Sequence, residues 1–171
     1  DIVMMQADGI HLFGTHYDGF MGKLLDWNLV KQPLAFLLFM ISGFAETNRL
    51  PFDFPEAEQE LAAGFHTEYS AMKFALFFLG EYIAMFVISA VTVTLFLGGW
   101  SFFGLEELGW LMQVGIFMGK TIFLLFFFIW VRWTLPRFRY DQLMRLGSQV
   151  FLPLGLLNVL LTGVLMLIFK V

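Results

Sequence analysis

The sequence contains no cysteine. It therefore forms no disulfide, and it offers no thiolate to zinc or to an iron–sulfur cluster. Histidine is scarce, and His11, His16 and His66 all lie outside the long apolar runs, where none can ligate a haem within a membrane. No glycine-rich phosphate-binding loop or other nucleotide signature is present. We therefore expect this chain to bind no cofactor or metal of its own, so any redox cofactor belongs to partner chains.

Charged residues are also scarce. Asp, Glu, Lys and Arg make up 14% of the residues, against about 25% in soluble domains. No basic tract is present, so nothing favours a nucleic-acid partner. Apolar surface takes the place of charge, because 59% of the residues are hydrophobic and the mean hydropathy is +0.77. This composition predicts an integral membrane protein in the lipid bilayer, here a single membrane domain covering 1–171.

Long apolar runs predict an all-α membrane fold. Transmembrane helices are expected at 27–45, 68–98, 111–133 and 150–169, with a short amphipathic helix in the loop 47–67. Pro33 falls inside the first run, where it either bends the helix or starts a new turn. The second run would be roughly 45 Å long as one helix. It therefore has to tilt or project out of the bilayer.

The distribution of basic residues predicts the orientation. Loops 47–67 and 132–149 lie on one side of the membrane, because two spans separate them. Arginines are concentrated on that side, whereas the loop 99–109 contains no basic residue. The positive-inside rule therefore places the acidic loop in the cytoplasm.

Acidic residues crowd one short stretch of that loop. Residues 46–61 hold five of the fourteen acidic residues of the chain, namely Glu46, Asp53, Glu56, Glu58 and Glu60. A solvated loop is the simplest explanation. Against it stand Phe52, Phe54 and Leu61, whose apolar side chains favour burial and leave the acids facing a cavity or a basic partner. Arg49 is the only basic residue of this loop.

Three carboxylates lie in or at the ends of the predicted spans: Glu46, Glu68 and Glu81. A carboxylate at bilayer depth is costly unless it is paired, protonated or hydrated. Each is either an interfacial residue that reaches water or a member of a proton path. Glu81 lies about 20 Å along its helix from Glu68, which favours the proton path. Lys120 either pairs with Glu81 or lies within reach of the outer surface.

Two long motifs resemble a known family. The first is Glu46-Thr-Asn-Arg-Leu-Pro-Phe-Asp-Phe-Pro-Glu-Ala-Glu-Gln-Glu-Leu, continued by Gly64-Phe-His-Thr-Glu-Tyr-Ser. The second is Phe128-Ile-Trp-Val-Arg, followed by Leu-Pro-Arg-Phe-Arg-Tyr-Asp-Gln-Leu-Met. Both are similar to the H subunits of the proton-pumping NADH–quinone oxidoreductase, respiratory complex I. The resemblance covers essentially the whole chain but only the C-terminal half of the family's all-helical protein.

The resemblance implies a membrane subunit that forms part of a quinone channel and couples quinone reduction to proton translocation. Quinone would be the substrate, with NADH, FMN and the iron–sulfur clusters on partner subunits of the peripheral arm and further subunits in the membrane arm. The implied cavity loop carries Arg49, Asp53, Glu56, Glu58 and Glu60, and the proton path carries Glu46, Glu68 and Glu81. The implied second cytoplasmic loop carries Arg132, Arg137, Arg139 and Asp141. The implied location is a bacterial inner membrane.

The chain departs from the family at Ser148-Gln149, where Trp-Lys is usual. That change removes an interfacial anchor and a positive charge. Two alternatives stay open: the related membrane subunit of a membrane-bound hydrogenase or formate hydrogenlyase, and a purely structural anchor for a peripheral arm. A free-standing ion transporter is disfavoured, because four spans without an inverted repeat enclose no site.

Overall fold

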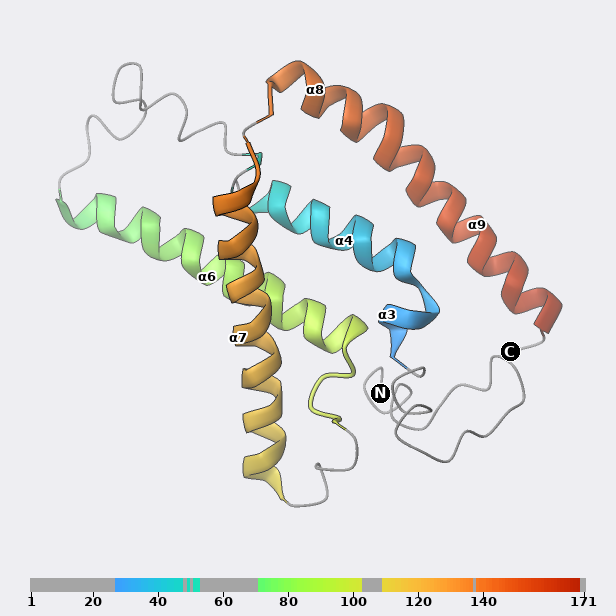
Figure 1. Ribbon diagram of the computed structural model, residues 1–171, viewed down its shortest axis with the longest axis horizontal. Coiled ribbons are helices and arrows are strands. Elements are labelled where there is room, and N and C mark those ends of the chain that lie inside the picture. Colours follow the sequence, from blue (N-terminus) through green and yellow to red (C-terminus); the bar gives the residue numbers. More distant parts are fainter. Residues whose placement is uncertain are drawn as a thin grey trace.

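A computed structural model describes residues 27–47, 49, 51–52, 71–102, 109–136 and 138–169 of the chain. Every regular element in these ranges is a helix (Figure 1). In chain order these are α3 (Asn28–Lys31), α4 (Pro33–Glu46), α6 (Ala71–Phe96), α7 (Trp110–Thr134), α8 (Tyr140–Arg145), the π-helix η3 (Leu146–Phe151) and α9 (Leu152–Phe169). The predicted amphipathic helix of the loop 47–67 lies largely outside the described residues.

Three helical segments are long and apolar enough to cross a membrane: Met72–Phe96, Trp110–Thr134 and Asp141–Val164. They confirm the predicted all-α membrane class. The third begins well before the predicted boundary at residue 150, because α8, η3 and α9 follow one another as a single helical rod (Figure 1). Ser148 and Gln149 lie on exposed positions of η3, where the Ser148 hydroxyl donates to the Met144 carbonyl at 2.7 Å.

The predicted first span is divided in two. Gln32 leaves the helical region with φ −135° and ψ 65°, and Pro33 then occupies the first turn of α4. Proline suits that position, because its ring presets the helical φ and its missing N–H would have no partner there. Of the two outcomes expected for Pro33, the structure shows a new helix. The 14 residues of α4 give it a length of about 21 Å, less than the ~30 Å of a hydrocarbon core.

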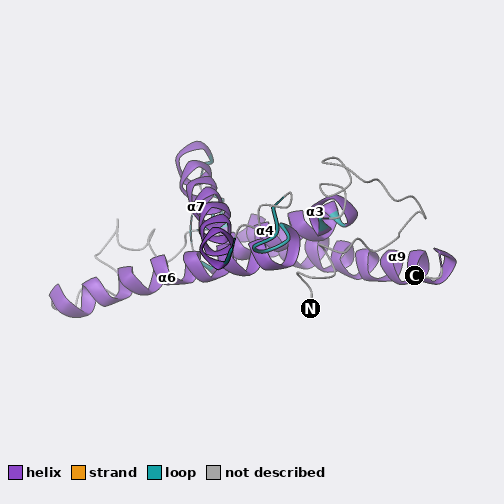
Figure 2. Cartoon of the chain, turned by 90° about the horizontal axis from the view of Figure 1, so that it is seen from below, coloured by secondary structure: helices purple, strands orange, loops and turns teal. Residues whose placement is uncertain are grey.

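The helices α4, α6 and α7 pack around one small core. In Figure 1, α7 crosses α6, and α4 runs beside α6; in Figure 2, α7 lies against one side of α6 and protrudes from it. The core holds apolar residues of all three helices: Met40, Phe44, Met85, Val93, Leu124 and Phe128, with Phe52 beyond the end of α4. The Phe44 and Phe128 ring centroids are 4.2 Å apart.

Small and hydroxyl residues let these helices approach closely. A Cβ placed on Gly43 would lie 2.9 Å from Cγ2 of Ile88, so only glycine permits the present distance between α4 and α6. Thr92 of α6 and Thr121 of α7 are fully buried, and each hydroxyl donates to the carbonyl four residues earlier in its own helix. Such residues are typical of helix contacts inside membranes, where apolar burial alone does not drive association.

Candidate functional site

The site forms where α4 ends beside α6. Thr47 follows the last residue of α4 and is buried, with 3% of its surface exposed. Its hydroxyl donates to the Gly43 carbonyl at 2.9 Å and lies 3.3 Å from the Phe44 carbonyl. These carbonyls belong to the last turn of the helix, and each also accepts a backbone N–H, Gly43 from Thr47 at 3.1 Å and Phe44 from Arg49 at 3.3 Å. Thr47 thereby fixes the direction in which the chain leaves α4.

That exit places Arg49 between α4 and α6. The Arg49 N–H donates to the Phe44 carbonyl at 3.3 Å, and its own carbonyl accepts the Phe52 N–H at 2.8 Å. Two backbone bonds thus hold the residue in a tight turn. Only 7% of the Arg49 side chain is exposed, although arginine is among the residues that are almost never fully buried unless paired.

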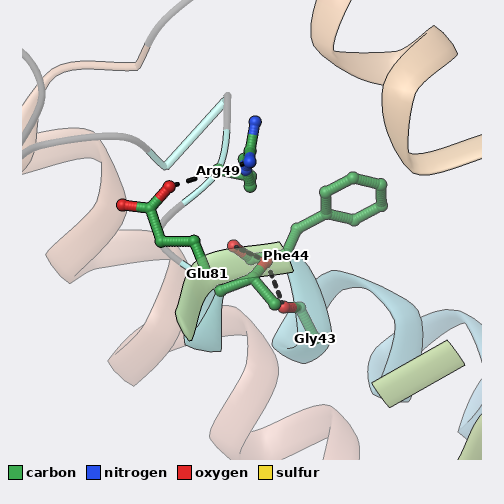
Figure 3. A network of polar contacts seen from close by, with 5 residues as sticks. Gly43, Phe44, Arg49 and Glu81 are labelled. Carbon is green, nitrogen blue, oxygen red and sulfur yellow. Dashed lines mark hydrogen bonds and ion pairs between the residues drawn. The ribbon is translucent and has the colours of Figure 1, made fainter. Parts of the chain in front are cut away.

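Two residues of α6 face the Arg49 guanidinium. Its Nη2 lies 3.7 Å from Oε2 of Glu81, an arrangement shown in Figure 3. Its Cζ lies 4.8 Å from the ring centroid of Tyr82. The Glu81 side chain is 43% exposed, so solvent screens the pair and its net contribution to stability is about 0–1 kcal/mol. The cation–π contact adds about 0.5–1 kcal/mol.

The donor capacity of Arg49 is not used up. The separation of 3.7 Å from Glu81 exceeds hydrogen-bond range, and Nε and Nη2 have no hydrogen-bond acceptor among the described residues. A buried guanidinium with unmet N–H groups carries a free-energy cost that an additional acceptor would remove. The site therefore favours an anionic or carbonyl ligand beside Glu81.

The two loops predicted to share one side of the membrane meet at this site. The backbone N–H of Phe138 donates to the Pro51 carbonyl at 3.1 Å. The rings of Phe52 and Phe138 pack with centroids 5.8 Å apart. This contact joins the segment after α4 to the segment between α7 and α8, which confirms that both lie at the same end of the helices.

The remaining predicted site residues are distributed as follows. Glu46 is the exposed last residue of α4, three positions before Arg49. Arg132 lies in the last turn of α7, while Arg139 immediately precedes α8 and Asp141 lies in its first turn. The structure thus brings Arg49 and Glu81 together and places these four at the helix ends next to the two loops. Asp53, Glu56, Glu58, Glu60, Glu68 and Arg137 lie outside the described residues.

Lys120 lies near the other end of α6. Its Nζ donates to the carbonyls of Leu97, Gly99 and Ser101 at 2.6, 3.1 and 2.6 Å. Leu97 follows Glu81 by sixteen residues, or about 24 Å of helix. Of the two placements considered for Lys120, pairing with Glu81 is therefore wrong.

Sequence patterns did not predict three contacts at the site. Arg49 is the only basic residue of its loop, and this pattern does not indicate Glu81 as its partner. The buried role of Thr47 and the contact of Phe138 with Pro51 left no periodic signal. Among the described residues, no group of three or more His, Cys, Asp or Glu side chains is placed to hold a metal ion.

The apolar helices and the charged pair between them define an all-α integral membrane protein with a polar site at one end of its helices. A family model described as NADH dehydrogenase matches residues 1–163. The chain belongs to this NADH dehydrogenase family.

Named relatives agree with this assignment. The chain is 56% identical over 137 residues to an NADH-quinone oxidoreductase H subunit of Geobacter metallireducens, covering 80% of this chain and 40% of the relative. It is 49% identical over 175 residues to NADH-quinone oxidoreductase subunit 8 of Rhodothermus marinus, covering 93% of this chain and 50% of the relative. It is 48% identical over 149 residues to an NADH-quinone oxidoreductase H subunit of Cytophaga hutchinsonii, covering 84% of this chain and 44% of the relative. The chain thus spans half the length of these relatives or less.

Proposed function

We propose that this chain is part of the membrane subunit of a proton-translocating NADH–quinone oxidoreductase, where it forms one wall of the quinone channel. The family and the names of the relatives support the quinone enzyme rather than a hydrogenase. The single observation that carries the site is Arg49, a buried guanidinium that faces Glu81 and has donors that no described residue accepts. A quinone carbonyl, or the charge that develops on it during reduction, is the kind of acceptor that these donors favour.

The mechanism we propose is electrostatic. Quinone reduction, completed with cofactors held by peripheral-arm subunits, changes the charge near Arg49 and the loop acids Asp53, Glu56, Glu58 and Glu60. A charge at Arg49 is felt at Glu81, because the two groups are 3.7 Å apart at a half-buried position. Protonation of Glu81 then changes, and Glu46, Glu68 and Glu81 pass the change into the membrane arm.

The second loop is proposed to hold this wall in place. Phe138 bonds to Pro51, two residues from Arg49, so the segment that carries Arg132, Arg137, Arg139 and Asp141 supports the turn around Arg49. Its arginines would face the peripheral-arm subunits on the cytoplasmic side of a bacterial inner membrane. The iron–sulfur clusters are assigned to partner subunits because this chain supplies no thiolate, and FMN and NADH because it contains no nucleotide-binding signature.

Glu81→Gln in the assembled complex tests the proposal, because it keeps the shape of the side chain and removes its titratable group. Proton translocation per quinone reduced is expected to fall in proteoliposomes, while the complex still assembles. Tyr82→Phe is the matched control, since it keeps the aromatic ring under Arg49 and should translocate normally. Full translocation by Glu81→Gln would remove Glu81 from the path. A purely structural anchor predicts instead that loop-acid variants alter assembly and leave quinone kinetics unchanged.

A further inference from the structure

Lys120 makes a set of contacts that the proposed function does not use. It lies on α7, ten residues after Trp110, inside an apolar segment long enough to cross a membrane. A lysine in such a segment is costly unless its ammonium finds partners. Here it finds three carbonyls, those of Leu97, Gly99 and Ser101, together with the rings of Trp27 at 4.7 Å and Phe102 at 5.6 Å.

These carbonyls belong to the segment that directly follows α6. Gly98 and Gly99 have positive φ values of 69° and 54°, which turn the chain sharply away from the helix. The turn folds the carbonyls of Leu97, Gly99 and Ser101 around one point, and the C-terminal end of a helix carries a partial negative charge. A compact ammonium with three donors suits such a cluster of acceptors. Lys120 therefore ties the end of α6 to the middle of α7.

The opposite end of the contact between these helices carries the pair of Arg49 and Glu81. Leu97, the residue directly after α6, lies sixteen residues beyond Glu81. An α-helix is stiff along its axis, so fixing one end against α7 fixes the axial position of the other. A shift of α6 by one residue would move Glu81 by about 1.5 Å and rotate it by roughly 100°. Either change would take its carboxylate away from Arg49.

We infer that Lys120 is a positioning residue for proton coupling, because its ammonium, held in the carbonyl cluster of Leu97, Gly99 and Ser101, fixes α6 so that Glu81 faces Arg49. This inference rests on the proposed function. It assigns Lys120 no contact with quinone and no proton transfer of its own.

Variants of the assembled complex test it in proteoliposomes, with quinone reduction and proton translocation measured separately. Lys120→Met keeps the length and apolar stem of the side chain and removes the ammonium. Loss of charge-assisted hydrogen bonds should shift the equilibrium between the fixed and the displaced position of α6 by about tenfold. The number of protons translocated per quinone should therefore fall by about threefold or more. Lys120→Arg keeps charge and donors and should retain most of the coupling. Lys73→Met, at an exposed position of α6, is the matched control and should behave as the unmodified complex.

Two further measurements separate positioning from a general structural effect. In a Glu81→Gln background, Lys120→Met should cause no additional loss, because both changes act at the same carboxylate. In Lys120→Ala, propylammonium should restore coupling, whereas tetramethylammonium, which has charge but no N–H donor, should not; translocation is then read as membrane potential, because propylamine crosses the bilayer and dissipates a pH gradient. If the Lys120→Met complex does not assemble, the role of Lys120 is tested instead with the Lys120→Ala complex assembled in the presence of propylammonium. Removing the amine should then lower the protons translocated per quinone while quinone reduction continues.

The outcomes distinguish this inference from the function on which it rests. Full translocation by Glu81→Gln overturns the proposed role of Glu81 in the proton path, whatever the lysine variants do. Lowered translocation by Glu81→Gln together with normal translocation by Lys120→Met overturns only the role of Lys120. Additive losses in the double variant, or equal rescue by the two ammonium ions, also overturn that role.

Discussion

The backbone N–H of Phe138 donates to the carbonyl of Pro51 at 3.1 Å, and this bond joins two segments that lie more than eighty residues apart in the chain. Next to it the Phe52 ring, which is 5% exposed, packs against the Phe138 ring. The bond and the ring contact together close the turn around Arg49 against the segment between α7 and α8. The position of Arg49 therefore depends on residues that carry no charge.

Replacing Phe52 with alanine should loosen this closure. Removal of a buried phenylalanine ring costs about 3–5 kcal/mol, so the assembled complex should unfold at a lower temperature and reduce quinone more slowly. Phe52→Leu should lose less, because it refills most of the volume. Trp133→Ala is the control, since the Trp133 side chain is 83% exposed. A Phe52→Ala complex as stable as the control would show that the ring contact does not support the site.

Gly43 should tolerate no larger residue. A Cβ there would meet Cγ2 of Ile88 at 2.9 Å, and the β-branched side chain of isoleucine has little freedom to move away. Gly43→Ala should destabilise the complex by about 1–3 kcal/mol through overpacking, detected as a lower unfolding temperature. Adding Ile88→Ala should recover part of the loss. Gly115→Ala is the matched control, because no atom of the described residues lies within 4 Å of a Cβ at that position of α7.

The sequence was sufficient to predict the class of fold, since long apolar runs and scarce charge leave few alternatives to membrane helices. It also predicted that the two loops share one side, because the number of spans between them decides that. The end of the first helix was harder, since Pro33 is compatible with a bend or a new start. The partners of Arg49 and Lys120 were out of reach. They depend on how α4, α6 and α7 cross, and single-residue patterns do not encode that geometry.

The sequence around Lys120 nevertheless contains a local pattern that can predict such a contact in other membrane proteins. Gly98-Gly99 marks a helix end whose carbonyls turn outward, and a lysine within the next apolar segment is a natural donor to them. This pairing of a lysine with the carbonyls after a helix end explains why Lys120 of α7 lies far from Glu81 of α6.

The Thr47 hydroxyl should matter to the site although it lies outside every charged motif. Thr47→Val keeps the shape of the side chain and removes the bond to the Gly43 carbonyl, at a cost of about 1 kcal/mol. Because Thr47 directs the chain toward Arg49, quinone reduction should also slow. Thr134→Val is the matched control, since Thr134 bonds in the same way to the Trp130 carbonyl at 3.1 Å on an exposed position of α7. Equal effects of the two changes on stability and rate would contradict the role of Thr47.

Arg49 and Glu81 should be coupled weakly in stability and strongly in function. Their separation is 3.7 Å, and Glu81 is 43% exposed, so a double-mutant cycle with Arg49→Met and Glu81→Gln should give a coupling energy of about 1 kcal/mol or less in unfolding. The same cycle measured on proton translocation should be far from additive, because either single change disrupts the same Arg49–Glu81 pair. Arg49→Lys should not restore the function, since an ammonium lacks the planar donors that face Glu81 and the Tyr82 ring. Additive effects on translocation would show that the two side chains act separately, and the electrostatic link between quinone and Glu81 would then have to run through another residue.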